Sequence, residues 1–263
     1  MRPSADEITQ ALRATAGRVV GRRVEVHEEI DSTNLGALRR AEAGASEGLL
    51  VLAHTQTAGR GRLGRSWADV PGGCLLFSVL LRPLRGAEGL LPAAAALSVV
   101  EAVRAELQLQ AEIRWPNDLV LAERKFGGVL AERSGGDLAA VGVGINVNGS
   151  PADLPEELRD TAAFLSPAVG ADVDLLSLLR AILRRLDDNY LLLCEGDTRT
   201  IVKRVEELDC VVGRQVCMLA GGEQVSGLAI GWRPTGALAV RDDLGRVHEF
   251  QAGEVTLRPR AER

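Results

Sequence analysis

The sequence predicts an α+β fold, with a mixed or antiparallel central sheet flanked by helices and a small β-barrel at the C-terminal end. Two patterns support this fold class. Apolar runs of strand length are interspersed with helical patterns up to residue 209, whereas short strands separated by glycine turns follow from Val211. We therefore expect a main domain over residues 1–209 and a barrel over residues 210–263. The 263 residues, 46% of them hydrophobic, suffice for a sizeable core.

Composition narrows the function classes. The net charge of −5 provides no overall basic field for nucleic acid or an anionic membrane. The four cysteines form no C-x-x-C pair and, like the three histidines, are scattered, so no structural metal site is predicted and metal ligands stay unknown. The N-terminus lacks a signal-peptide core, and the longest apolar run, 90–100, is too short for a bilayer. We expect a soluble, cytoplasmic protein.

The elements follow from periodicity and turn signals. Asp31–Asn34 precedes a helical pattern that ends near Gly44, and the segment Gly149–Val169 is polar, proline-rich and long, as lids over sites often are. Helices are expected over 7–17, 88–109, 175–186 and 198–208. Strands are expected over 23–30, 48–53, 74–81, 112–115, 119–121, 125–132 and 138–148, and in the barrel over 215–219, 225–232, 237–241 and 247–251.

An arginine–glycine loop is the strongest candidate for the chemistry. The stretch Thr55–Trp67 places three arginines among three glycines. Glycine lets the backbone approach a bound group closely, and arginine donates a charged fork of N–H groups to a carboxylate or phosphate. A flexible segment that touches RNA electrostatically is the alternative. The loop lies between two apolar runs that read as buried strands, Gly48–Ala53 and Cys74–Leu81, which favours a built anion site.

Three further motifs accompany the loop, and each has a structural alternative. Ser32 or Thr33 can simply cap the following helix, although a helix N-terminus can also hold a polar ligand group. Pro116-Asn117-Asp118 is a turn signature that precedes Lys125, one of only two lysines. Gly142 and Gly144 interrupt a central strand, where glycine often marks the approach of a ligand.

Taken in order, these motifs resemble the biotin protein ligases. The strings Gly-Arg-Gly-Arg-x-Gly-Arg-x-Trp and Trp-Pro-Asn-Asp, the latter followed seven residues later by lysine, carry a resemblance that covers Glu29 to Leu257. It implies a class II synthetase-like catalytic domain with an SH3-like barrel. It also implies an enzyme that makes biotinyl-5′-adenylate from biotin and ATP with Mg²⁺, and then biotinylates one lysine of a carboxylase carrier domain.

The resemblance also assigns residues to biotin. Polar side chains would meet the ureido ring, glycines would let the backbone close over the valeryl chain, and cations would hold the carboxylate. The residues implied are Ser32, Thr33, Asn34, Gln56, Gly59, Arg60, Gly61, Arg62, Lys125, Gly128 and Gly144.

On the nucleotide side it implies Arg60, Arg62, Arg65, Trp67, Asn117, Lys125 and Asn146. The catalytic set would be Arg60, Arg62 and Lys125 as cations, with Asp118 as a general base for the incoming lysine. Several of these residues can also have a purely structural role. Trp67 can be a core tryptophan, Arg65 a surface charge and Asp118 a turn residue, while Asn117 and Asn146 can bond to backbone groups.

Two departures from the family pattern concern the site, namely the bulky Phe126 and the Ala162–Leu165 run in the expected lid. We expect no operator binding, because the DNA-binding domain of repressor-type relatives is missing from this sequence and the net charge is acidic. The family pattern allows a homodimer. The alternative enzyme is a lipoate ligase. The dithiolane ring of lipoate is apolar, so that alternative predicts an apolar pocket in place of the polar residues Ser32, Thr33 and Gln56.

Overall fold

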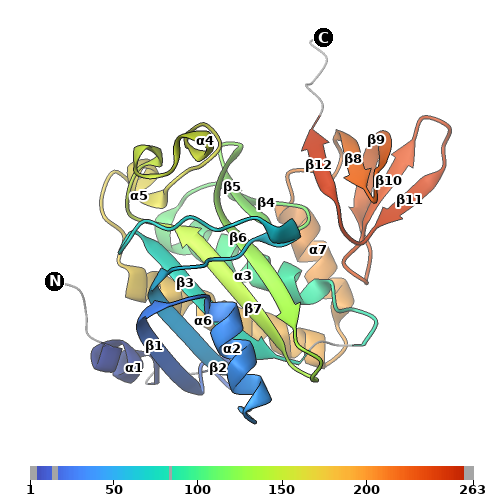
Figure 1. The fold of residues 1–263 in the computed structure, drawn as a ribbon. Helices are drawn as coiled ribbons and strands as arrows, with labels where there is room; N and C mark the ends of the chain where they lie inside the picture. The colour runs from blue at the N-terminus through green and yellow to red at the C-terminus, as the bar shows by residue number, and fades with distance from the viewer. Residues whose placement is uncertain (1–4, 14–16, 83–84, 258–263) are drawn as a thin grey trace.

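The computed structural model describes residues 5–13, 17–82 and 85–257, and its centre is one seven-stranded sheet (Figure 1). The strand order is β1-β2-β3-β7-β6-β5-β4. β1 and β2 are parallel and all other neighbours are antiparallel, so the predicted mixed sheet is confirmed. The strands are β1 (Arg23–Ile30), β2 (Leu49–Gln56), β3 (Cys74–Leu81), β4 (Ala111–Arg114), β5 (Asp118–Leu121), β6 (Arg124–Arg133) and β7 (Ala139–Asn146).

Side-chain alternation gives the two faces of this sheet different roles. On β3, Phe77 and Val79 belong to the large hydrophobic core, while Ser78 between them bonds to Thr33 and Asn34 at the start of the next helix along the chain from β1. On β7, Val143 packs in the core and its neighbours are glycines. Because successive side chains of a strand point to opposite faces, one face carries the large core, and part of the other face can hold a site.

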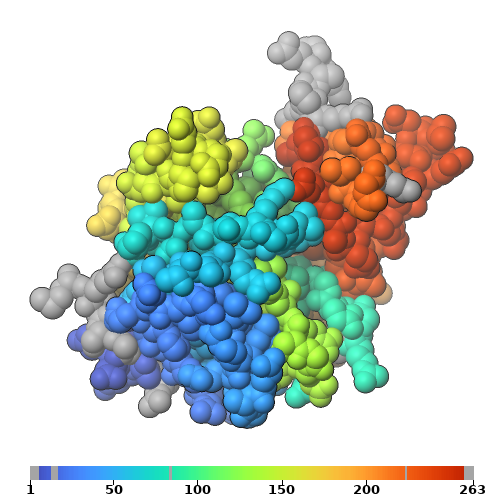
Figure 2. All heavy atoms as spheres, in the orientation of Figure 1, coloured from blue at the N-terminus to red at the C-terminus, as the bar shows by residue number. Residues whose placement is uncertain are grey.

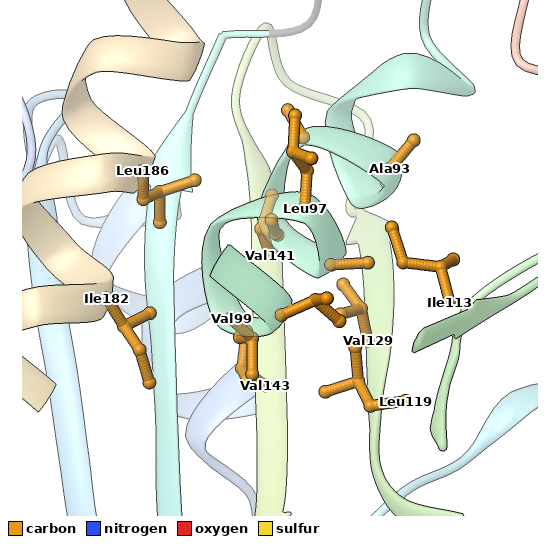
Figure 3. Close-up of a cluster of buried hydrophobic side chains, with 14 of the residues drawn as sticks. Ala93, Leu97, Val99, Ile113, Leu119, Val129, Val141, Val143, Ile182 and Leu186 are labelled. Carbon is orange, nitrogen blue, oxygen red and sulfur yellow. The ribbon is translucent and has the colours of Figure 1, made fainter. Parts of the chain in front are cut away.

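Helices cover the core face (Figure 3). The first three turns of α3 (Leu90–Leu107) are largely apolar and buried, as expected for a helix inside a core, and α3 packs against α6 (Leu175–Cys194) and α7 (Thr198–Leu208). α1 (Ala5–Arg13) packs on β1, and residues 14–16 of the expected first helix lie outside the described residues. Among the described residues, none of the helices combines the length and hydrophobicity needed to cross a lipid bilayer.

The opposite face carries α2 (Thr33–Glu42), which packs on β2, β3 and β7. Its apolar side, Ala37 and Leu38, meets Leu80 and Ala140 in a small separate core cluster. This contact is confined to one end of the sheet face, so the N-terminus of α2 stands over the middle strands.

The C-terminal residues form a second, five-stranded antiparallel sheet in the order β11-β10-β9-β8-β12. Its core is continuous with the main one, because Val216 and Trp232 belong to the same hydrophobic cluster as α3. The sequence patterns did not predict the last strand. The strands are β8 (Gln215–Ala220), β9 (Glu223–Trp232), β10 (Leu238–Asp242), β11 (Val247–Phe250) and β12 (Glu254–Leu257).

The segment expected as a lid, Gly149–Val169, contains three short helices: η2 (Pro151–Asp153), α4 (Glu156–Arg159) and α5 (Leu165–Val169). Leu154, Ala162 and Phe164 bury each other in a cluster of their own. The segment is also bonded to β6, since Lys125 N–H donates to the Thr161 carbonyl and Ala163 N–H donates to the Lys125 carbonyl. The departure noted at Ala162–Leu165 is thus an apolar anchor.

Candidate active site

A cavity of about 460 Å³ opens on the sheet face that carries Gly142, Gly144 and Asn146. In Figure 2 the arginine–glycine loop crosses the molecule in cyan, between the expected lid and the C-terminal sheet. The predicted site residues that line the cavity are Ser32, Thr33, Asn34, Gln56, Arg60, Gly61, Arg62, Arg65, Trp67, Asn117, Asp118, Lys125, Gly128, Gly144 and Asn146. Gly59 lies beside the loop backbone instead, where an added Cβ would stand 2.8 Å from the Trp67 carbonyl oxygen.

One end of the cavity is polar and fully structured. Thr33 N–H and its hydroxyl both donate to Gln56 Oε1, at 2.7 and 3.0 Å. The Ser78 hydroxyl lies 2.8 Å from Thr33 Oγ1 and 2.7 Å from Asn34 Oδ1. Ser32, Thr33 and Asn34 are all nearly inaccessible to solvent. These contacts fix the side chains of Thr33, Asn34 and Gln56 before any ligand arrives.

The same contacts correct the capping interpretation. Ser32 occupies the N-cap position of α2 with extended backbone angles, but its side chain makes no capping hydrogen bond. The Thr33 hydroxyl is hydrogen-bonded to Gln56 on β2 and to Ser78 on β3. Helix capping by these side chains therefore does not explain the motif.

Proton counting shows what this end of the cavity can bind. Three oxygen–oxygen contacts, Thr33–Gln56, Ser78–Thr33 and Ser78–Asn34, share only two hydroxyl hydrogens. These oxygens can therefore accept further hydrogen bonds, and the Gln56 amide nitrogen adds donors at the same end. A ligand that offers N–H donors complements it, whereas an apolar ligand head would leave buried polar groups unpaired.

The other end of the cavity is cationic. Arg60 Nη2 lies 3.0 Å from Glu132 Oε1, and Arg62 Nη1 donates to Asn117 Oδ1 at 3.1 Å. Partial burial lowers the pKa of Arg62, although a guanidinium stays charged at neutral pH. Lys125 Nζ lies 2.5 Å from Asp118 Oδ1. This cluster of fixed cations is suited to carboxylate and phosphate groups.

The arginine–glycine loop is held by a contact to the C-terminal sheet and by a hydrogen bond within the loop. Arg65 is 70% exposed, yet it pairs with Glu254 of β12 and so links the loop to the C-terminal sheet. Gly61 N–H donates to the Arg65 carbonyl, which closes the loop on itself. With all three arginines engaged by other elements, the loop does not match the flexible, RNA-touching alternative.

Trp67 forms a wall of the cavity over β7. An added Cβ on Gly144 would stand 2.8 Å from Trp67 Cε2, so glycine is required for the indole to lie on the strand. Gly142 has the same relation to Asn34, at 2.3 Å from Oδ1. Trp67 Nε1 is buried and, within the described part of the chain, without a hydrogen-bond partner. Both strand glycines thus admit side chains of the protein, and Trp67 lies outside the core clusters.

The two asparagines bond to backbone carbonyls, which is the structural alternative stated for them. Asn117 Nδ2 donates to the Val129 carbonyl at 2.6 Å, and Asn146 Nδ2 donates to the Ala163 carbonyl at 3.3 Å. Both still line the cavity. Phe126, suspected of narrowing the pocket, points into the core and is fully buried.

Several cavity residues escaped sequence reasoning. The expected lid contributes an apolar wall, and β12 contributes a rim next to Arg65. These additional lining residues are Leu63, Ser66, Ala68, Arg114, Trp115, Pro116, Val129, Leu130, Val143, Leu154, Leu158, Thr161, Ala162, Gly253, Glu254, Val255 and Thr256. Gly142, which the sequence already marked as a place where a ligand could approach, lines the cavity too. Ser78, which bonds to Thr33 and Asn34 at the polar end, was also missed. Its sequence signal is that it is a single serine within an apolar strand. Across the described ranges, no group of three or more His, Cys, Asp or Glu side chains could hold a metal ion.

Comparison with known proteins agrees with this geometry. Residues 26–148 match the model of the Biotin/lipoate A/B protein ligase family. The bifunctional ligase/repressor BirA of Bacillus subtilis is 35% identical over 193 residues, which cover 71% of this chain and 58% of that protein. The chain thus spans less than two thirds of that relative's length.

Two further relatives are matched over nearly their whole length. The biotin–[acetyl-CoA-carboxylase] ligase of Mycobacterium tuberculosis is 30% identical over 269 residues, covering 97% of this chain and 96% of that protein. The structure of the Aquifex aeolicus biotin protein ligase in complex with biotin and ATP superposes with a TM-score of 0.78 at 34% identity, covering 90% of this chain and 98% of that one. This chain belongs to the biotin protein ligase family.

Proposed function

We propose that this protein is a biotin–protein ligase, which activates biotin with ATP to biotinyl-5′-AMP and transfers the biotinyl group to one lysine of a biotin carboxyl carrier domain. One observation carries the proposal: a single cavity joins a polar, hydrogen-bonding end at Thr33 and Gln56 to a cationic end at Arg60, Arg62 and Lys125. The ureido ring of biotin carries two N–H donors, and its carboxylate lies at the far end of an alkyl chain. The structure of the Aquifex relative is a complex with biotin and ATP.

In the first step the biotin carboxylate attacks the α-phosphorus of ATP, and pyrophosphate leaves. Negative charge gathers on the transferred group, so preorganised cations in a shielded pocket provide the main stabilisation. Arg60, Arg62 and Lys125 line the cavity and supply those cations.

In the second step the carrier lysine attacks the acyl carbon, and AMP leaves. The lysine must first lose a proton, and Asp118 is the proposed acceptor because its carboxylate lines the cavity next to Lys125. Its place at the start of β5 agrees with the turn alternative too, so only the separated half-reactions distinguish the two roles.

Mg²⁺ is proposed to enter with ATP. This ion is usually held by substrate phosphates, waters and one or two carboxylates. Glu254 is a carboxylate in the described cavity lining that has no role in the two steps above, which fits such a mode. When bound, the ion would neutralise phosphate charge.

We also propose residues 1–209 as the catalytic unit, residues 210–263 as the small barrel, and the cytoplasm as the site of action. Because the net charge is −5, we propose that this chain binds no operator DNA, and a gel-shift signal at physiological salt would contradict that. Association as a homodimer stays a prediction.

The proposal is tested by incubating the protein with ATP, biotin and a carboxyl carrier domain, and then measuring the mass of the carrier. We expect the mass to rise by one biotinyl group, and a carrier without its acceptor lysine to stay unchanged. Lipoate in place of biotin provides the second arm. An unmodified carrier, or faster modification with lipoate, would contradict the proposal.

A further inference from the structure

Glu132 stands behind the cavity and contacts both of its ends. It lies on β6, where Leu130 two residues earlier lines the cavity, and its side chain is 19% exposed. Its Oε2 accepts a hydrogen bond from Asn34 Nδ2 at 2.8 Å. Its Oε1 lies 3.0 Å from Arg60 Nη2. The two oxygens of one carboxylate thus hold one residue from each of two segments.

Asn34 is fixed in one orientation by its surroundings. Its Nδ2 donates to Glu132 and to the Leu130 carbonyl, while its Oδ1 lies 2.7 Å from the Ser78 hydroxyl. Gly142 leaves room for this amide. Reversing the amide would place its oxygen against two acceptors, so the network determines which way it points.

A carboxylate is the group that suits both contacts of Glu132. Asn34 Nδ2 and Arg60 Nη2 are both donors, and an ionised carboxylate has only acceptors. In a Glu132→Gln variant one of the two positions becomes an NH₂ group that faces a donor. One contact is then lost and the other loses its charge, although the size of the side chain is unchanged.

We propose that Glu132 is a positioning residue that couples the polar end of the cavity to the anion-binding loop. Glu132 aligns Asn34 beside Thr33, and through Arg60 it sets the cation that meets the carboxylate of the ligand. This role rests on the proposed function, since it concerns the binding of biotin.

The test is calorimetry of wild-type protein and Glu132→Gln with two ligands, biotin and biotinol, its analogue with an alcohol in place of the carboxylate. We expect Glu132→Gln to weaken biotinol about tenfold, as for loss of one charge-assisted hydrogen bond, and to weaken biotin several-fold more. The preference for biotin over biotinol therefore falls. In an Arg60→Gln background, Glu132→Gln should weaken both ligands equally, because contacting residues are not additive.

Unchanged affinities, or equal weakening of both ligands by Glu132→Gln alone, would overturn the role of Glu132. Glu249→Gln, which loses an exposed pair with Arg233, serves as the matched control and should leave both affinities unchanged. Glu132→Asp keeps two acceptor oxygens and should retain more of the preference than Glu132→Gln, so it replaces that variant if Glu132→Gln does not fold. If the wild type binds no biotin, the proposed function itself fails.

Discussion

The ammonium nitrogen of Lys125 lies 2.5 Å from Asp118 Oδ1, across the hairpin of β5 and β6. Both side chains are partly exposed to the cavity, at 40% for Lys125 and 29% for Asp118. The cation proposed for adenylate formation and the base proposed for transfer are therefore in direct contact. The two half-reactions can be separated by substituting one member of the pair at a time.

Replacing Lys125 with arginine keeps the charge and changes its shape. A planar guanidinium cannot occupy the position of the compact ammonium beside Asp118 without displacing one of them. We expect adenylate formation to fall about 100-fold, the usual effect of losing one transition-state contact. Single-turnover formation of biotinyl-AMP from labelled ATP measures this, and an unchanged rate would show that Lys125 is incidental.

Asp118→Asn should separate the two steps in the opposite sense. The amide keeps the turn and the β5 backbone but cannot accept a proton from the carrier lysine. We expect adenylate to form at a rate near that of the wild type, and its transfer to the carrier to slow about 100-fold at neutral pH. Transfer from preformed adenylate is the measurement. Normal rates in both half-reactions would remove Asp118 from the mechanism and leave it a turn residue.

Gly144→Ala tests the wall formed by Trp67. The new Cβ would stand 2.8 Å from the indole, so the ring must move away from β7. We expect the KM for ATP to rise about tenfold, with a smaller change for biotin, as for a misplaced binding contact. Gly136→Ala is the control, because an added Cβ there meets open space. Equal KM values for ATP in the two variants would exclude a nucleotide role for Trp67.

Asp209 makes stability depend on pH. Burial raises the pKa of this carboxyl from 3.8 to about 6, even though it accepts hydrogen bonds from Val211 N–H, Val212 N–H and Trp232 Nε1–H. The folded state therefore holds the proton more tightly than the unfolded state. The stabilisation from this group is complete below pH 3.8 and is lost as the pH rises through about 6.

Asp209→Asn should remove that dependence. Relative to the wild type, we expect the free energy of unfolding of the variant to increase between pH 4 and 7, by about 3 kcal/mol at most, since one pKa unit corresponds to about 1.4 kcal/mol. Urea unfolding at several pH values measures this difference. A difference that is constant with pH would show that Asp209 titrates alike in both states.

Most of the fold follows from local patterns. Apolar runs predicted β2 and β3, and an alanine-rich apolar stretch predicted α3, because burial on both sides leaves a clear signal in the chain. The candidate site followed from motifs of unusual composition and from the family resemblance that they carry, and fifteen of its sixteen predicted residues line one cavity. Gly59 lies beside the loop backbone instead, because the Trp67 carbonyl occupies the space at its Cα.

Long-range contacts explain what was missed. β12 is a four-residue strand with only partial burial, and its partner β8 is more than thirty residues away in the chain. The apolar anchor of Leu154 and Phe164 depends on Ala68 and Val70, which no local pattern connects to it. In the sequence, Glu132 looks like an ordinary solvent-facing charge on a strand. Only the folded structure shows its contacts with Asn34 and Arg60.

Biotin-dependent exchange of labelled pyrophosphate into ATP tests the account most directly, because it reports the condensation of a carboxylate with the α-phosphate in this cavity and needs no carrier. We predict exchange that requires biotin and falls sharply in Lys125→Arg. The absence of exchange in the wild-type protein with biotin and Mg²⁺-ATP would contradict the account.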